Sequence, residues 1–186
     1  MSYEAFDRQA RYSTVAIGLH WAIALLLTAN IVLGFFHDSW GRTASAWLMF
    51  FHKSIGLSVL ALTIFRLLWR LAHRPPPLDD ALKRWEAGLA RSVHAAFYAL
   101  LLALPLTGWM FSSSWGRPNP FFGLVEIPAL PVPNSDGART LFGELHEILG
   151  FLAIALIGLH VAGALKHHLQ GHRHLIGRMA PPLCRD

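Results

Sequence analysis

The sequence predicts an all-α fold in which four helices run up and down through a membrane as one bundle. Of its 186 residues, 54% are hydrophobic and 15% are charged, whereas a soluble domain carries charge on about a quarter of its residues. Four apolar runs are each long enough to cross about 30 Å of hydrocarbon at about 1.5 Å per residue. They define a single domain over residues 1–186, with expected spans at 14–36, 47–71, 89–112 and 145–168.

Lysine and arginine are distributed unevenly among the segments between these spans. The two tails and the second connection are rich in them, whereas the first and third connections contain only Arg42, Arg117 and Arg139. Because basic residues stay on the cytoplasmic side of a membrane, both termini are expected to be cytoplasmic. The net charge of +5 is then explained by contact with anionic membrane lipid, and no nucleic-acid partner is expected.

The third connection, residues 113–144, contains five prolines, which exclude a continuous helix or a central strand. Its apolar residues would be costly in water, so we expect an ordered cap over the outer mouth of the bundle. The single cysteine, Cys184, excludes an intrachain disulfide framework and a covalent C-x-x-C-H haem attachment.

Histidines inside the spans carry the main functional signal. The chain has eleven histidines, and four of those in the apolar runs are the candidate ligands: His20, His52, His146 and His160. Fourteen residues separate His146 from His160, so both rings leave one helix face about 21 Å apart along the axis. Since neighbouring spans run in opposite directions, His20 lies at the depth of His160, and His52 lies at the depth of His146.

Two facing imidazoles at each of two depths are what axial ligation of two stacked b-type haems requires. Two alternatives are less consistent with the pattern. A single membrane histidine often only bonds a neighbouring helix, but four at matched depths are harder to explain in that way. A zinc site needs three or four converging ligands, whereas these residues form two separate pairs.

The spacing of fourteen recurs on two other helices. Gly34 follows His20 by fourteen residues, where the flat ring of the outer haem would require a missing side chain. Arg66 follows His52 by fourteen, at the inner depth, where an arginine needs an anionic partner such as a haem propionate. Gly56 and Gly150 each lie about one turn from a proposed ligand, although such glycines are also common helix packing contacts.

Other polar residues lie near the two predicted sites. His94 opens the third span and could bond an inner propionate or sit among lipid headgroups. His167, Arg74 and Ser13 could form a polar lip for a quinone carbonyl, with a snorkelling interfacial histidine as the alternative. Lys53 adjoins the outer site, where it could serve the propionates or attract a small anion.

Six motifs occur in order along the spans: "GLHW", "HKSIG", "PPPL", "YALLLALPLTGW", "LHEILG" and "GLHVAG". Together they resemble the bacterial cytochrome b561 family, the dihaem four-helix cytochromes of the inner membrane. The resemblance implies two b haems on His20, His52, His146 and His160, and electron exchange with the quinone pool. Members of the family act as superoxide oxidases, passing electrons from superoxide outside to ubiquinone.

The resemblance implies that Lys53 and the outer haem receive the electron, and that the inner haem, His167 and Arg74 deliver it to quinone. The leading hypothesis is therefore a superoxide:ubiquinone oxidoreductase. The second is a haem-bearing anchor and electron-transfer subunit for a partner dehydrogenase or hydrogenase. A third, a histidine-lined transporter without haem, is excluded if the purified protein shows a reducible b-type spectrum.

Overall fold

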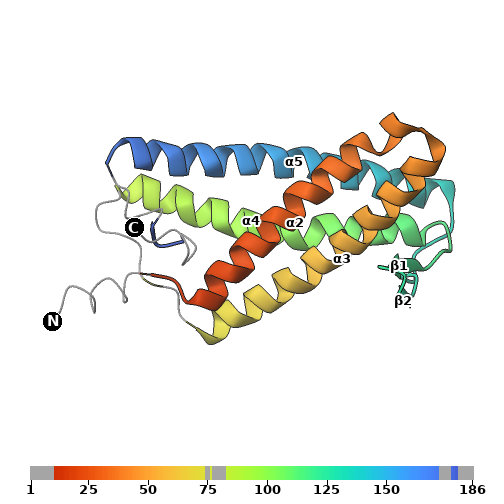
Figure 1. The fold of residues 1–186 in the computed structure, drawn as a ribbon, viewed down its shortest axis with the longest axis horizontal. Helices are drawn as coiled ribbons and strands as arrows, with labels where there is room; N and C mark the ends of the chain where they lie inside the picture. The colour runs from red at the N-terminus through yellow and green to blue at the C-terminus, as the bar shows by residue number, and fades with distance from the viewer. Residues whose placement is uncertain (1–10, 74–75, 77–82, 172–176, 180–186) are drawn as a thin grey trace.

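The computed structural model of the protein describes residues 11–73, 76, 83–171 and 177–179. Within these ranges the chain is mainly helical (Figure 1). The elements, in order, are α2 (Thr14–Phe36), the 3-10 helix η1 (His37–Trp40), α3 (Gly41–Ala72), α4 (Arg84–Ser113), strands β1 (Asn119–Phe121) and β2 (Val125–Ile127), and α5 (Asp136–Leu169).

In the described part of the chain, three helical stretches are long and apolar enough to cross a membrane, by length and composition. They are Thr14–Ala72, Arg84–Ser113 and Asp136–Leu169, and the first of them includes α2, η1 and α3. The chain reverses direction at η1, where Gly41 has a φ of 80° that side-chain-bearing residues rarely adopt. Figure 1 shows α2 and α3 running in opposite directions from this turn.

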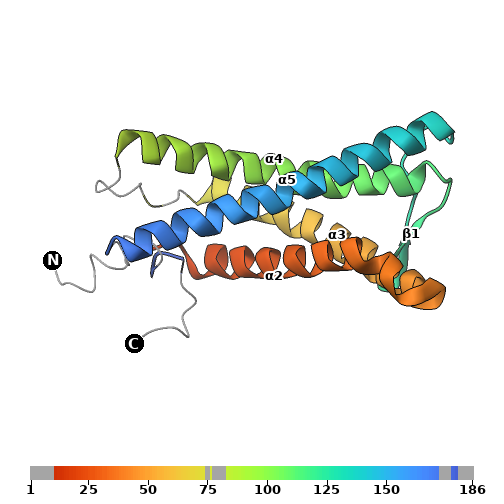
Figure 2. The ribbon, with the colours of Figure 1, turned by 90° about the horizontal axis from the view of Figure 1, so that it is seen from above.

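Each helix packs on the next in the sequence: α2 on α3, α3 on α4, and α4 on α5 (Figure 2). Two ends of the molecule can be distinguished. One end, called here the hairpin end after the β1–β2 hairpin, holds η1, β1 and β2 (Figure 1). The other, called the terminal end, holds the start of α2, the end of α3, the start of α4 and the end of α5.

Three helices begin earlier than the spans expected from hydropathy: α3 at Gly41, α4 at Arg84 and α5 at Asp136. The reason is that backbone hydrogen bonding continues into polar sequence, which hydropathy does not register as part of a span. At α5 the start is defined by Ser135, whose side-chain oxygen accepts a hydrogen bond of 3.3 Å from Ala138 N. The connection expected over 113–144 is therefore shorter in the structure, where it ends at residue 135.

The connection between α4 and α5 forms a short hairpin in which β1 and β2 pair in antiparallel fashion. Pro120 is tolerated in β1 because the sheet has only two strands, so each strand is an edge. Ser54 on α3 fastens the hairpin. Its hydroxyl donates to Pro120 O at 3.1 Å and accepts from Phe122 N at 3.0 Å.

A layer of buried apolar residues lies halfway along the helices. Leu27, Val59 and Leu101 belong to one packed cluster, and Ala153 of α5 is buried at a corresponding depth, with exposed fractions of 7%, 2%, 8% and 0%. Each lies seven residues, or about two turns, after a histidine of the same helix. This layer separates the hairpin end from the terminal end, whereas many outward-facing leucines and phenylalanines are exposed, as a helix in lipid requires.

Candidate functional site

The first pair of histidines lies toward the hairpin end. His52 on α3 and His146 on α5 face each other with ring centroids 5.9 Å apart and ring planes at 88°. Both side chains are partly buried. The structure thus brings together two residues that are 94 positions apart in the sequence and that the depth argument paired.

Each ring of this pair is held by a backbone carbonyl on a neighbouring helix. His52 Nδ1 lies 3.0 Å from Asn30 O on α2, and His146 Nδ1 lies 2.9 Å from Leu104 O on α4. A carbonyl oxygen can only accept, so Nδ1 must carry the proton and donate. The lone pair is then on Nε2. This tautomer, with the ring in this orientation, is suited to binding a metal through Nε2.

A glycine makes room for each of these rings. A Cβ added to Gly34 would lie 2.8 Å from His52 Cε1, and a Cβ added to Gly108 would lie 2.8 Å from His146 Cε1. We expected Gly34 to face a haem ring, and in the structure its neighbour is the His52 imidazole. Gly108 was not predicted, although it follows His94 by the same fourteen residues that separate Gly34 from His20.

The second pair lies toward the terminal end. His20 on α2 and His160 on α5 have ring centroids 6.2 Å apart, with planes at 64°. A third imidazole is close, since the His94 ring on α4 lies 6.0 Å from that of His160, and Phe97 packs edge-on against His160 at 5.3 Å. Among the described residues, no group of three or more histidine, cysteine or acidic side chains is arranged to hold a bare metal ion.

Both pairs fit a haem iron bound from two sides. A metal atom about 2 Å from one nitrogen of each imidazole holds the ring centres roughly 6 Å apart, and the observed separations are 5.9 and 6.2 Å. Within the described residues, α2 and α5 lack the extensive close backbone contacts that join each helix to the next in the sequence. Gly150 faces open space, since nothing lies within 4 Å of a Cβ added there.

Arg66 and Ser13 line a cavity of about 380 Å³ at the terminal end. Arg66 Nη1 donates to Ala16 O at 2.9 Å and Nε donates to Tyr98 Oη at 3.3 Å. Ser13 caps α2 and also accepts a bond of 3.2 Å from Trp69 Nε1. Of the other predicted quinone residues, His167 lies in the last turn of α5 and does not line this cavity, and Arg74 lies outside the described residues.

Lys53 extends from α3 to α4 beside the hairpin-end pair. Its half-buried Nζ donates to Ser112 Oγ at 2.9 Å, and Ser112 in turn donates to the side chain of buried Asn119. Arg117 lies within electrostatic range of Lys53, so this corner carries two positive charges. Gly56, the remaining predicted glycine, faces Asn30 Nδ2, with 3.4 Å left for a Cβ.

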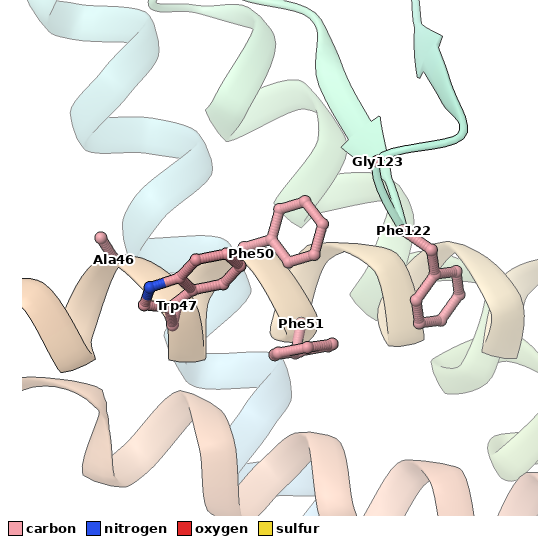
Figure 3. A pocket seen from close by; sticks show the side chains of 6 residues that line it. All are labelled: Ala46, Trp47, Phe50, Phe51, Phe122 and Gly123. Carbon is pink, nitrogen blue, oxygen red and sulfur yellow. The ribbon is translucent and has the colours of Figure 1, made fainter.

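A separate apolar pocket of about 650 Å³ opens between the first turns of α3 and the hairpin (Figure 3). Three phenylalanines and a tryptophan form most of its wall, and none of its lining residues can carry charge. The lining residues are Ala46, Trp47, Phe50, Phe51, Phe122 and Gly123.

Apolar helices that bring histidines together in facing pairs define a class of protein, the membrane cytochromes of electron transfer. The chain belongs to one family of that class, the prokaryotic cytochrome b561 family, whose match covers residues 11–182. The resemblance seen in the sequence motifs is thereby confirmed. Membership identifies an electron-transfer protein of the membrane and implies b-type haem.

Three curated relatives resemble the chain over nearly its whole length. Cytochrome b561 homolog 2 of Escherichia coli (strain K12) is 29% identical, with 91% of this chain and 90% of the relative covered. Probable superoxide oxidase CybB of Yersinia pestis is 33% identical, covering 92% and 96%. Cytochrome b561 homolog 1 of Escherichia coli (strain K12) is 27% identical, covering 92% and 97%.

Proposed function

We propose that the chain crosses the membrane four times, with both termini in the cytoplasm, and binds two b haems. The 59-residue stretch Thr14–Ala72 is too long for one crossing, which takes about 20 residues. The reversal at Gly41 divides it into two crossings, α2 and α3. The terminal end then corresponds to the cytoplasmic face, where lysine and arginine are concentrated, and the hairpin end to the outer face.

The observation that carries the proposal is the pair of facing imidazoles at each end of α5. On this assignment His52 and His146 hold the outer haem, and His20 and His160 hold the inner haem. Bound haem supplies a one-electron couple at each site. The protein supplies the ligands, their orientation and an apolar layer between the sites. We assign Arg66 and His94 to the propionates of the inner haem, because both lie beside the terminal-end pair.

The activity that we propose is superoxide:ubiquinone oxidoreduction. Two superoxide anions give up one electron each and become O₂, and one ubiquinone takes up both electrons and two protons to become ubiquinol. Lys53 and Arg117 place positive charge at the outer corner, which favours approach of a small anion. The similarity to a probable superoxide oxidase supports the same activity.

For the quinone we propose the terminal-end cavity that Ser13 lines. His167 and Arg74 stay quinone contacts predicted from the sequence alone. Trp69 and Tyr98 give this cavity aromatic walls, and Ser13 and Arg66 give it hydrogen-bond donors. An aromatic wall with a few polar groups suits a flat ring that bears carbonyl oxygens.

Stopped-flow spectroscopy of the purified dihaem protein tests the proposal. Mixing with superoxide should reduce haem faster than the spontaneous background, and adding ubiquinone should reoxidise it. The protein in which Lys53 is replaced by Gln serves as a matched control with the same haem content and less positive charge. Absence of reduction above background by superoxide would contradict the proposed substrate and leave the haem assignment intact.

The apolar pocket in Figure 3 favours a second candidate, an anchor and electron-transfer subunit for a partner dehydrogenase or hydrogenase. Exposed aromatic side chains such as Trp47 are typical of surfaces that bind protein. On this alternative the isolated protein would not react with superoxide. It would instead be reduced only after a partner is added, so the same stopped-flow experiment separates the two candidates.

A further inference from the structure

The two histidines at the hairpin end are held by the same arrangement, used twice. On α2, the carbonyl of Asn30 accepts from His52 Nδ1, and Gly34 lies four residues later. On α4, the carbonyl of Leu104 accepts from His146 Nδ1, and Gly108 lies four residues later. Residues four apart share a helix face, so in each case the missing side chain exposes the carbonyl one turn away.

The glycines are required by the geometry of this arrangement. An alanine Cβ at position 34 or 108 would lie 2.8 Å from Cε1 and 3.1 Å from Nδ1 of the facing ring. A real Cβ does not approach ring atoms this closely, so the ring must withdraw, and withdrawal breaks the bond from Nδ1 to the carbonyl. Glycine at these two positions is therefore what keeps both rings bonded to backbone.

In the part of the chain that the structure describes, the terminal-end pair makes no such bonds. Among the described residues, no hydrogen bond engages a ring nitrogen of His20 or His160, and His160 instead packs edge-on against other rings. The hydrogen bonds of the ring nitrogens distinguish the two sites better than nearby positive charge does. Each site has a cation in electrostatic range, Arg66 of His20 and Lys53 of His52.

We propose that Gly34 and Gly108 are positioning residues that lower the midpoint potential of the hairpin-end haem below that of the terminal-end haem. The inference rests on the proposed function, since it takes the four histidines as the haem ligands. A proton shared by Nδ1 with a carbonyl raises the electron density on Nε2, which makes the ring a more basic ligand and stabilises oxidised iron. Both ligands at the hairpin end have this support.

The consequence is a direction for the electron. It moves from the site of lower potential to the site of higher potential, oxidising the hairpin-end site and reducing the terminal-end site, with no bond formed or broken. Transfer across the apolar layer is then favourable from the hairpin end toward the terminal end. This direction agrees with a donor outside and an acceptor in the inner part of the membrane.

A spectroscopic redox titration of the purified dihaem protein tests this order. The wild-type protein should show two components, and His146→Ala should remove the one with the lower potential. Gly108→Ala and Gly34→Ala should each raise the potential of that component and change its low-spin EPR signal, leaving the other component unchanged. Gly88→Ala on α4 and Gly18→Ala on α2 are matched controls, because nothing lies within 4 Å of their added Cβ.

A second variant acts in the opposite direction and does not require the ring to move. Thr107 Oγ1 donates to Leu104 O at 2.8 Å, so it shares the acceptor of His146 Nδ1, and it lies 3.4 Å from Nδ1 itself, too far for more than a weak hydrogen bond. Thr107→Val removes this competing donor, which should strengthen the His146 bond and lower the potential of the same component. This variant keeps the proposal testable if the alanine variants do not accumulate.

Three results would overturn the inference: His146→Ala removing the component of higher potential, the glycine variants shifting both components equally, or none of the variants shifting either. A wild-type protein with fewer than two haems would instead contradict the proposed function itself. The titration therefore separates failure of the positioning role from failure of the haem assignment.

Discussion

Replacing one histidine of a pair should remove one haem and leave the other in place. We expect His146→Ala to lose the hairpin-end haem and His20→Ala to lose the terminal-end haem, so that each protein falls from two haems per chain to about one. The physical reason is that each site takes one nitrogen from each of two helices, so one truncation leaves the iron with a single protein ligand.

The size of the loss follows from the separation of the two sites. Fourteen residues of α5 place them about 21 Å apart, and substitutions more than about 10 Å apart with no shared partners act independently. The buried residues Leu27, Val59, Leu101 and Ala153 each lie seven residues after a histidine of the same helix, so they fall between the two sites. A single truncation should therefore halve the haem content rather than abolish it.

Haem content is measured as pyridine haemochrome per mole of chain, together with reduced-minus-oxidised spectra. His94→Ala removes a proposed propionate contact but no axial ligand, so this variant should keep two haems. Because the His94 ring lies 6.0 Å from that of His160, adding His94→Ala to His20→Ala also shows whether His94 substitutes for the lost ligand. His37 lies within electrostatic range of His52, so His146→Ala is also combined with His37→Ala. Retention of two haems by this double variant would refute the pairing of His52 with His146.

Three other substitutions test separate parts of the structure. Lys53→Gln should lower the second-order rate constant with superoxide roughly tenfold at low salt and weaken its ionic-strength dependence, as measured by stopped flow at several salt concentrations. Ser54→Ala removes the hydroxyl that bonds both Pro120 and Phe122, and should cost about 1–3 kcal/mol, seen as a lower Tm in detergent. Ala153→Leu adds volume at a fully buried position and should cost about 1–3 kcal/mol, with unchanged Tm arguing against the packed layer.

The relative depths of the histidines could be predicted from the sequence because they depend only on regular helix geometry. A rise of about 1.5 Å per residue and alternating helix direction place His20 with His160, and His52 with His146. The structure brings the rings of these residues to 6.2 and 5.9 Å. No knowledge of side-chain packing was needed for that step.

The atoms that orient the rings could not be predicted in the same way. Whether a carbonyl of α2 or α4 faces His52 depends on how each helix is rotated about its axis, which is decided by packing between helices. Gly108 was missed for this reason, because its role is visible only once the His146 ring is seen against it. The start of α5 at Asp136 was missed because a Ser135 cap and a polar first turn do not register in hydropathy.

The spacing pattern explains why only α5 carries two of the proposed ligands. α2 and α4 follow one pattern, a histidine and then a glycine fourteen residues later. α3 and α5 begin a second pattern with His52 and His146. Fourteen residues after these histidines, α3 has Arg66 and α5 has His160. Arg66 donates to Ala16 O and Tyr98 Oη, so it joins α3 to both α2 and α4. A guanidinium cannot give a lone pair to iron, so on the proposed assignment α3 supplies a ligand at the hairpin end alone.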